Sequence, residues 1–312
     1  MKLVGDIGGT NARFALVDEA TGALLDERTL PAADHADLAT AAASYLRGRA
    51  VREAAVAVAA VVSDDVIELT NSHWRFSVRD TRDRLGLDHL HVVNDFTALA
   101  LALPLLRDDE RRQVGSGAAS VNRPVALLGA GTGLGVSGLV PSPSGWIPLE
   151  GEGGHTAFSP VNARESAVLE RLRTRFDHVS TERLASGPGL QLLHETLADV
   201  DGVSVPVLSP EEITRRAAAG DARCDEVIEM FCGILGTAAA NLCVTLGALG
   251  GVYVGGGIAP GLGTRFDRSC FRARFEAKGR FRTYVAQVPT FVITAANPAL
   301  RGVARVLDCG TT

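Results

Sequence analysis

A strand–glycine turn–strand unit occurs twice in this chain, once in each half. In the first copy, apolar residues 2–4 lead into Gly5-Asp6-Ile7-Gly8-Gly9-Thr10-Asn11, and residues 12–17 continue as an extended apolar segment. In the second copy, residues 125–128 lead into Gly129-Ala130-Gly131-Thr132-Gly133-Leu134-Gly135, and residues 136–140 are again extended. A short turn and a third strand follow each copy, at residues 23–30 and 146–149. The repeat predicts an α/β protein whose two related halves face a shared cleft.

Turns of this kind are suited to binding phosphate groups. Because glycine has no Cβ, its backbone N–H group can approach an anion closely. Asp6 adds a carboxylate to the first turn, and Thr10 adds a hydroxyl. A hairpin without a ligand explains the first turn equally well when that turn is taken alone. The chain has no Gly-x-x-x-x-Gly-Lys-Ser/Thr, and its first glycine run does not open a helix, which excludes the P-loop and dinucleotide fingerprints.

A third glycine turn, Gly255-Gly256-Gly257, follows the strand-like residues 251–254. Three consecutive glycines leave room for a flat group, such as an adenine and its ribose, against the backbone. Close packing of a strand against a helix is the alternative explanation.

Together these motifs resemble the bacterial glucokinase family, which belongs to the sugar kinase, actin and heat-shock ATPase superfamily. The resemblance covers nearly the whole chain and includes Glu152-Gly-Gly-His155, and the motifs occur in the family's order. It implies a two-domain actin-like ATPase (ribonuclease H-like) fold. The small domain would contain residues 1–106 and 296–312, and the large domain residues 107–295. It also implies a homodimeric glycolytic enzyme that uses ATP and Mg²⁺ to phosphorylate glucose or a related hexose.

By this resemblance the glycine turns hold the nucleotide. The backbone and side chains expected to contact it belong to Gly5, Asp6, Ile7, Gly8, Gly9, Thr10, Asn11, Gly131, Thr132, Gly133, Gly255, Gly256 and Gly257. Asp6 is expected to hold Mg²⁺ through water.

Asn94-Asp95 lies where a predicted strand, residues 89–93, meets a predicted helix that starts near Phe96. Ligands of open α/β folds gather at the carboxyl ends of strands. Phosphoryl transfer to an alcohol needs a carboxylate that positions the hydroxyl and accepts its proton. We therefore predict that Asp95 is the catalytic base and that Asn94 and Asp95 bind the sugar. Helix capping by this dipeptide is the alternative, and the family pattern Asn-Asp-Phe-x-Ala favours the catalytic interpretation.

Further sugar contacts are predicted at Glu152, His155, Glu182 and Asn71. A carboxylate and an imidazole together supply acceptors and donors for sugar hydroxyls, although a solvated loop would also explain Glu152 and His155. Glu182 and Asn71 follow from the resemblance, and Glu182 has the alternative role of a first-turn helix residue. Residues 61–65, Val-Val-Ser-Asp-Asp, depart from the family's Pro-x-x-Gly-Asp segment and leave the exact hexose open.

Composition narrows the possible partners. A length of 312 residues predicts two domains, and a net charge of −5 without a dense basic stretch argues against nucleic acid. The five cysteines are scattered, without zinc spacing, as expected for free thiols in the cytoplasm. The apolar stretches at residues 54–62 and 96–106 are too short to cross a membrane, and Asp6 interrupts any signal peptide. We expect no membrane partner.

Other segments predict the remaining elements. Residues 54–62 predict a buried strand, residues 107–123 a linker or surface loop, and residues 221–246 and 297–307 helices. Asn162 is expected to cap a helix through residue 176, Ser209 to start a capping box, and Pro104 to end the helix after Asp95.

Two other functions share these features. A sugar-binding regulator on the same fold would lack the base or carry a DNA-binding domain. An ATPase that acts as a structural protein, like actin, would not need the polar sugar-binding residues. A kinase for mannose, fructose or an amino sugar is a further alternative.

Overall fold

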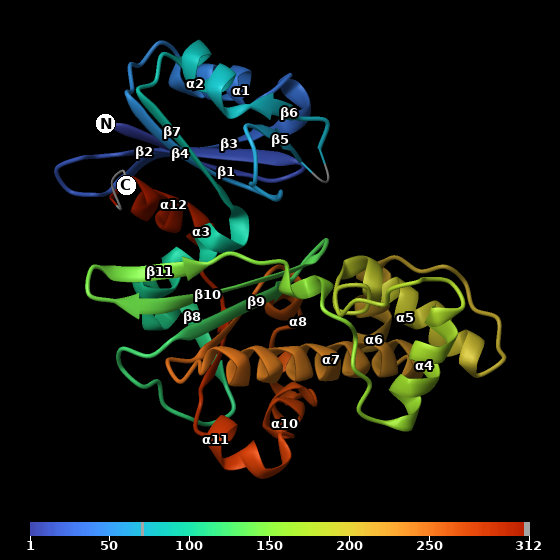
Figure 1. The fold of residues 1–312 in the computed structure, drawn as a ribbon. Coiled ribbons are helices and arrows are strands. Elements are labelled where there is room, and N and C mark those ends of the chain that lie inside the picture. Colours follow the sequence, from blue (N-terminus) through green and yellow to red (C-terminus); the bar gives the residue numbers. More distant parts are fainter. Residues whose placement is uncertain (70–71, 309–312) are drawn as a thin grey trace. The chain divides into compact units, whose positions relative to one another are not determined.

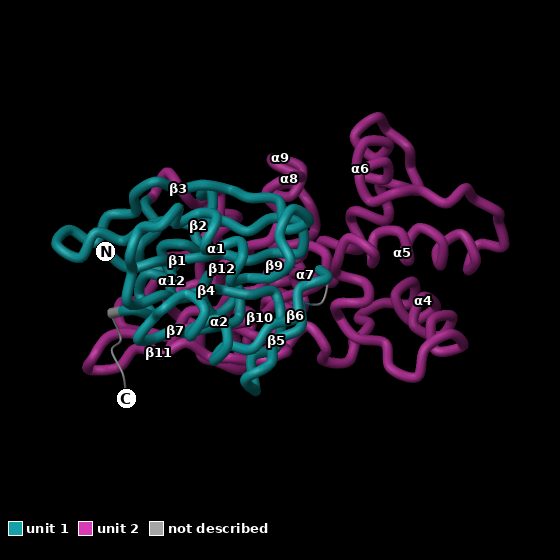
Figure 2. The backbone as a smooth tube through the Cα atoms, turned by 90° about the horizontal axis from the view of Figure 1, so that it is seen from above, with its two compact units in different colours: residues 1–107, 295–312 teal, residues 108–294 magenta. Residues whose placement is uncertain are grey.

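The computed structural model describes residues 1–69 and 72–308, and the chain divides into two compact units. Unit 1 comprises residues 1–107 and 295–312, and unit 2 comprises residues 108–294 (Figure 2). These limits differ by one residue from the domain boundaries expected from the sequence.

Unit 1 is built on a five-stranded sheet in the order β3-β2-β1-β4-β7 (Figure 1). β1, β2 and β3 pair in antiparallel fashion, whereas β1, β4 and β7 run parallel. The predicted hairpin and third strand are thus confirmed. The strands of unit 1 are β1 Lys2–Ile7, β2 Asn11–Val17, β3 Leu24–Pro31, β4 Glu53–Val58 and β7 His89–Asn94, with a separate hairpin of β5 Val66–Glu68 and β6 Arg75–Ser77.

Helices cover both faces of this sheet because successive side chains of a strand point to opposite faces. Leu3 and Ile7 pack on one face with Tyr45 of α1, whereas Val4 packs on the other with Leu300 of α12. The helices of unit 1 are α1 Leu38–Leu46, α2 Val78–Leu85, α3 Asp95–Ala102 and α12 Pro298–Asp308, with 3-10 helices at Ala32–Asp34 and Leu103–Leu105.

The crossing of α12 over α3 fixes the helix that begins with Asp95. A Cβ on Gly302 of α12 would overlap the carbonyl oxygen of Ala98 in α3, so this approach requires glycine. The predicted helix after Asp95 is confirmed, and Pro104 lies in the 3-10 helix that follows it. The predicted strand 54–62 stops earlier, at Val58.

Unit 2 repeats the strand order of unit 1 and adds one strand. Its sheet has the order β11-β10-β9-β12-β13-β8, with the β9–β10–β11 portion antiparallel and β9, β12 and β13 parallel. The internal repeat is therefore real at the level of topology. The strands are β8 Arg111–Val114, β9 Val125–Ala130, β10 Leu134–Ser142, β11 Gly145–Leu149, β12 Val252–Gly255 and β13 Thr290–Ile293.

The extra strand β8 corrects the prediction of a linker over residues 107–123. Arg111 and Arg112 make this segment look like a charged loop, but both find partners far along the chain. Arg111 donates to the Tyr253 hydroxyl at 3.0 Å, and Arg112 pairs with Asp267 at 2.9 Å. β8 then pairs with the edge of β13 in antiparallel fashion.

The long helix α7, Ala222–Leu246, confirms the helix predicted over residues 221–246, and it lies along the sheet of unit 2 (Figure 1). By length and composition it could cross a membrane, which the analysis of residues 54–62 and 96–106 did not anticipate. However, 67% of its most apolar window is buried inside the protein, where Phe231 and Leu235 are fully buried. α7 therefore has the burial of a core helix.

The remaining helices of unit 2 are α4 Ala163–Arg173, α5 Gly187–Val200, α6 Pro210–Ala218, α8 Ile258–Leu262, α9 Thr264–Arg268, α10 Phe271–Glu276 and α11 Arg282–Ala286, with 3-10 helices at Asp108–Glu110, Gly153–His155 and Gly279–Phe281. Among them, α5, α6, α10 and α11 contact α7. Asn162 caps α4 as predicted, although the helix ends at Arg173. Ser209 caps α6, but the capping box is incomplete because Glu212 pairs with Arg215 and Arg216 instead.

Candidate active site

Three parallel strands of unit 1 end side by side at one edge of the sheet. Ile7 at the end of β1 pairs with Val58 of β4, and Val58 pairs with Asn94 of β7. Neighbouring strands lie about 4.8 Å apart, so about 10 Å separates the ends of β1 and β7. This edge therefore carries both the first glycine turn and the Asn94-Asp95 pair, at the carboxyl ends of strands where such sheets bind ligands.

Asn94 caps α3, as the alternative interpretation of the dipeptide predicted. Its Oδ1 accepts from the amides of Phe96 at 2.8 Å and Thr97 at 3.4 Å, and its Nδ2 donates to the Ala60 carbonyl at 3.2 Å. These bonds use both lone pairs of Oδ1 and one of two N–H groups. At most one N–H can serve a sugar hydroxyl, so Asn94 acts first as a support for its neighbour.

Asp95 is the first residue of α3, and its side chain is partly buried. Its Oδ1 accepts from the Phe96 amide at 2.9 Å. A carboxylate at this position is a group that can accept a proton as a general base. The geometry suits the predicted role of Asp95, which stays a prediction.

The first glycine turn joins β1 to β2 and presents backbone amides. The Gly8 amide donates across the turn to the Asn11 carbonyl at 2.9 Å. No protein acceptor is bonded to the amides of Gly9 or Thr10 within the described part of the chain. A Cβ on Gly8 would meet only the Asn11 oxygen, at 3.6 Å, so the space beside the turn is open. An anion can therefore approach these amides.

Two other residues predicted to hold the nucleotide support the turn from inside the sheet. A Cβ on Gly5 would lie 3.1 Å from the side chains of Phe14 and Val56, so packing already explains this glycine. Ile7 is fully buried, and its carbonyl accepts from the Ala59 amide at 3.2 Å. Neither residue offers a side chain to a ligand.

Asp6 faces Arg13 across the hairpin. The Arg13 Nη1 lies 3.3 Å from Asp6 Oδ2, and the Asp6 side chain is 17% exposed. Burial raises the pKa of Asp6, and the charge of Arg13 opposes this effect. The described residues contain no group of three or more side chains that could hold a metal. One carboxylate is still compatible with Mg²⁺, which keeps several waters and commonly shares a site with phosphate groups.

Arg13 was not predicted as a site residue, although a signal for it was present. A hairpin whose turn consists of residues 8–11 places residues 6 and 13 opposite each other, as the register shows. An ionisable pair beside the predicted phosphate-binding turn could have been inferred from this symmetry.

The second turn, Gly131–Gly133, is here called the phosphate turn. The Gly131 amide donates to the Gly133 carbonyl at 2.8 Å, and the Gly131 carbonyl accepts from the Gly187 amide at 2.7 Å. The described residues supply no acceptor for the amides of Thr132 and Gly133. A Cβ on Gly131 would meet nothing within 4 Å, so this turn too is open to a ligand.

The third glycine turn lies beside the phosphate turn because β9 and β12 are parallel neighbours with Gly129 opposite Gly255. A Cβ on Gly129 would lie 2.5 Å from the carbonyl carbon of Gly255, and one on Gly256 would overlap the Ala130 carbonyl. Close backbone packing, the alternative explanation, therefore accounts for Gly129 and Gly256. Gly257 has open space around its Cα, so the predicted adenine contact can be made there.

Residues 152–156, here called the sugar loop, lie directly on β10. A Cβ on Gly153 would lie 2.7 Å from the Val136 side chain, and one on Gly154 would overlap the Leu134 carbonyl. These glycines thus permit close packing rather than mobility of the loop, and Glu152 and His155 are exposed.

Glu182 joins the sugar loop to the phosphate turn. Its Oε2 accepts from the Leu134 amide at 2.8 Å, its Oε1 lies 3.7 Å from His155 Nε2, and its amide donates to the Gly154 carbonyl at 2.9 Å. The sequence predicted a sugar contact at this residue, with a place in the first turn of a helix as the alternative. The alternative is wrong, because Glu182 lies in a turn that precedes α5. Its bond to Leu134, 48 residues away, could not be read from local pattern.

A cavity of ≈ 800 Å³ in unit 2 brings three predicted residues together: Thr132, His155 and Glu182 line it. Arg175 and Arg183, which were not predicted, also line this cavity. Their guanidinium groups lie over the Phe176 ring, 5.5 and 3.9 Å from its centre. The cavity thus combines carboxylate, imidazole, hydroxyl and guanidinium groups, which are suited to a polar ligand.

Two predictions concern the segment after β4. Asn71 lies outside the described residues. In the divergent segment, Asp65 accepts from the Arg79 amide at 3.0 Å and from the Ser77 hydroxyl at 2.6 Å. This aspartate is therefore committed to the start of α2.

Comparison with known proteins assigns the chain to a family. The sequence profile of the family described as Glucokinase matches residues 3–309. The chain belongs to the glucokinase family. The glucokinase of Aromatoleum aromaticum is 51% identical to it, over 98% of this chain and 94% of that protein.

Two further relatives allow the length and the fold of the chain to be compared. The bifunctional protein glk of Burkholderia thailandensis is 50% identical over 98% of this chain, which spans about half (48%) of that relative's length. A crystal structure of glucokinase from an Antarctic psychrotroph is 36% identical, with a TM-score of 0.89 and 99% of both chains covered. The likeness confirms that this member of the glucokinase family has the actin-like ATPase fold expected from its sequence.

Proposed function

We propose that this chain catalyses ATP-dependent phosphorylation of glucose to glucose 6-phosphate. Membership of the glucokinase family supports the proposal, as does the 51% identity to a glucokinase of nearly equal length. The observation that carries it is the grouping of the predicted residues. Thr132 of the phosphate turn lines one cavity with His155 and Glu182, and Asp95 shares a sheet edge with the first glycine turn.

In the proposed reaction Asp95 orients the sugar 6-hydroxyl and accepts its proton, while the γ-phosphoryl group is transferred in line. The open amides of Gly9, Thr10, Thr132 and Gly133 bind phosphate oxygens. Neither lysine of the chain is at a glycine turn: Lys2 pairs with Glu53, and Lys278 bonds to Asn241. We therefore assign charge stabilisation to backbone amides and Mg²⁺ rather than to a lysine.

We assign Mg²⁺ to Asp6, through water. The ion, when bound, would neutralise charge on the phosphate groups. It would also favour the ionised form of the Asp6 carboxyl, which burial disfavours in the free protein.

The experiment that tests the function is ADP release from ATP across a panel of hexoses, with a control that contains no sugar. The proposal expects ADP formation that depends on glucose and on Mg²⁺. Equal ADP formation without sugar would exclude a sugar kinase, and binding of sugar without turnover would favour a regulator. A larger kcat/KM for mannose, fructose or glucosamine would change the assigned substrate.

We also propose that the protein acts in the cytoplasm as a homodimer. The described cysteines, residues 224, 232, 243 and 270, are free thiols. Burial raises the pKa of Cys232 to about 12, which keeps this thiol protonated and unreactive. Thiols of this kind suit a reducing compartment. Light scattering after gel filtration tests the dimer.

A further inference from the structure

One short segment of unit 2, residues 180–187, bonds to both the phosphate turn and the sugar loop. The Gly187 amide donates to the Gly131 carbonyl at 2.7 Å. The Thr181 and Glu182 amides donate to the carbonyls of Thr156 and Gly154, at 2.8 and 2.9 Å. The backbone of this segment therefore connects the phosphate turn to the sugar loop through three hydrogen bonds.

The Glu182 side chain adds a second link, through groups that a ligand can displace. One carboxylate oxygen accepts from the Leu134 amide at 2.8 Å, directly after the phosphate turn. The other lies 3.7 Å from the His155 ring, which is 59% exposed. A single carboxylate thus touches the end of the turn and the exposed imidazole of the sugar loop.

Gly133 leaves the space in which this carboxylate sits. A Cβ at residue 133 would lie 2.6 Å from Glu182 Oε2, and its nearest contacts would be with Glu182 alone. Glu182 takes the Leu134 amide, whereas the neighbouring amides of Thr132 and Gly133 have no acceptor among the described residues. The carboxylate therefore contacts the turn directly beside the two amides that are open to a ligand.

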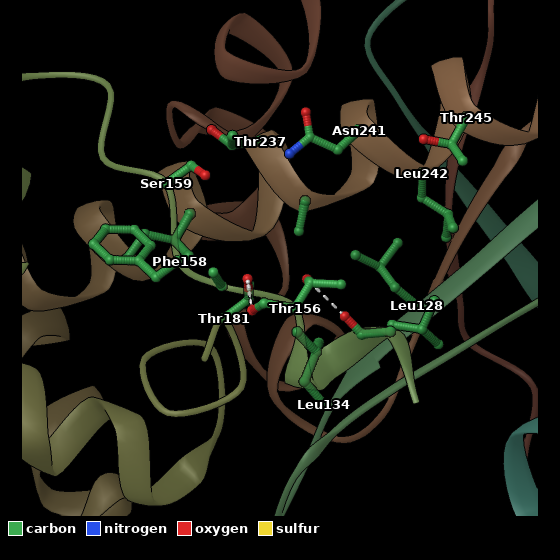
Figure 3. Close-up of a pocket in the computed structure, with 15 residues that line it drawn as sticks. Leu128, Leu134, Thr156, Phe158, Ser159, Thr181, Thr237, Asn241, Leu242 and Thr245 are labelled. Carbon is green, nitrogen blue, oxygen red and sulfur yellow. Dashed lines mark hydrogen bonds between the residues drawn. The ribbon is translucent and has the colours of Figure 1, made fainter. Parts of the chain in front are cut away.

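Part of the inner side of the sugar loop borders a cavity instead of packed side chains. This cavity, ≈ 270 Å³, lies between α7 and the loop, and Gly153, Thr156, Thr181 and Ile234 are among its lining residues (Figure 3). The Thr181 hydroxyl donates to the Thr156 carbonyl, and the Thr156 hydroxyl donates to the Gly153 carbonyl (Figure 3). Tightly packed interiors resist displacement, and a cavity behind a loop removes part of that resistance.

We propose that Glu182 is a positioning residue that couples sugar binding to the geometry of the phosphate turn. A sugar that binds His155 or one oxygen of the Glu182 carboxylate changes the hydrogen bond from the Leu134 amide. This change determines the orientation of the Thr132 and Gly133 amides, which receive the nucleotide. Sugar and nucleotide then raise each other's affinity by the same factor, as linkage requires. This inference rests on the proposed function, since it needs both ligands to bind.

The test is the dissociation constant of a non-hydrolysable ATP analogue, measured by calorimetry with and without saturating glucose. The wild-type protein should bind the analogue about fivefold or more tightly with glucose present. Glu182→Ala, which removes the link, should reduce this ratio to about 1. Glu182→Gln keeps an acceptor for the Leu134 amide and should retain most of the ratio.

Two further variants separate coupling from loss of a sugar contact or of the fold. Gly133→Ala keeps every polar side chain but displaces the Glu182 carboxylate, so its ratio should also fall toward 1. Its φ is not in the left-handed region, and the clash is with the end of a flexible side chain. Glu152→Ala, the matched control, should weaken glucose binding yet keep the wild-type ratio at saturating glucose.

The outcomes distinguish the two proposals. A wild-type protein that binds neither glucose nor the ATP analogue would contradict the proposed function itself. A wild-type protein that binds both ligands independently, or a Glu182→Ala variant with the wild-type ratio, would overturn the coupling alone. A Glu152→Ala variant that lost the ratio would also overturn it, because any damaged sugar contact would then suffice.

Discussion

The two glycine hairpins have the same topology but different supports. In unit 1, Asp6 and Arg13 face each other one pair before the turn and form an ion pair. The corresponding pair in unit 2 is Gly129 and Gly135. Gly129 has no side chain because the backbone of Gly255 lies against it. The carboxylate of unit 2 comes instead from Glu182, 48 residues beyond the Leu134 amide that it accepts from.

This difference shows that the same hairpin topology is supported in two ways. The hairpin of unit 1 carries its own charge and lies on the sheet edge that holds Asp95. The hairpin of unit 2 has no charged pair at this position, because its glycine packs closely against the third glycine turn. Its carboxylate contact comes from Glu182, which is distant in the sequence. Unit 1 should therefore respond to changes of charge, and unit 2 to changes of volume.

The largest expected effect is that of Asp95→Asn in unit 1. The substitution removes the proton acceptor while preserving the shape of the side chain, so kcat should fall about 10²-fold or more with little change in glucose affinity. Asp88→Asn, at the other end of β7 where Asp88 pairs with Arg52 at 3.6 Å, is the control and should keep wild-type kcat. Steady-state kinetics and calorimetric glucose binding measure both, and near-normal turnover by Asp95→Asn would exclude it as the base.

Two glycines of unit 2 that lie two residues apart should differ in what they affect. Gly129→Ala forces a methyl group against the Gly255 backbone, and it should lower the free energy of unfolding by about 1–3 kcal/mol. Gly131→Ala adds a methyl group in open space at an ordinary φ, so stability should be retained while KM for ATP rises about tenfold. Chemical denaturation and kinetics separate the two effects. Equal loss of stability in both variants would contradict the distinction.

Most of the fold could be predicted because its signals are local. Apolar runs interrupted by glycine turns gave both hairpins, and the length and composition of residues 221–246 gave α7. Asn162 and Asn94 illustrate how a single polar residue marks a helix start, since both accept from the amides expected of caps. The candidate site was predicted by motif, one residue type at a time.

The parts that could not be predicted depend on partners distant in sequence. β8 exists because residues 111–114 pair with β13, and its Arg111 and Arg112 bond to Tyr253 and Asp267. No local window of sequence contains these partners. Packing between Gly129 and Gly255, and the bond from Leu134 to Glu182, have the same origin. The sequence pattern thus identified the unusual residues. Tertiary contacts decided whether each of them packs against the backbone, supports a turn or is open to a ligand.

The smallest expected effect concerns the buried charge of unit 1. Because burial raises the pKa of Asp6 above its ordinary value of 3.8, the ionised carboxylate costs folding free energy at neutral pH, and this cost disappears as pH falls below 3.8. Asp6→Asn should therefore raise the free energy of unfolding at pH 7 by about 1 kcal/mol while it increases the Mg²⁺ concentration required for turnover.

The exposed Asp18 provides a control of opposite sign in the same unit. Hydrogen bonds from Thr21 lower the pKa of Asp18, so its carboxylate stabilises the folded state above pH 3.8, and this contribution is lost as pH falls through the lowered pKa. Asp18→Asn should thus destabilise the protein at pH 7 without changing its Mg²⁺ requirement. Denaturation curves at pH 7 and pH 3.5 test both variants, and a loss of stability in Asp6→Asn at pH 7 would show that the Asp6–Arg13 pair supports the fold rather than the reaction.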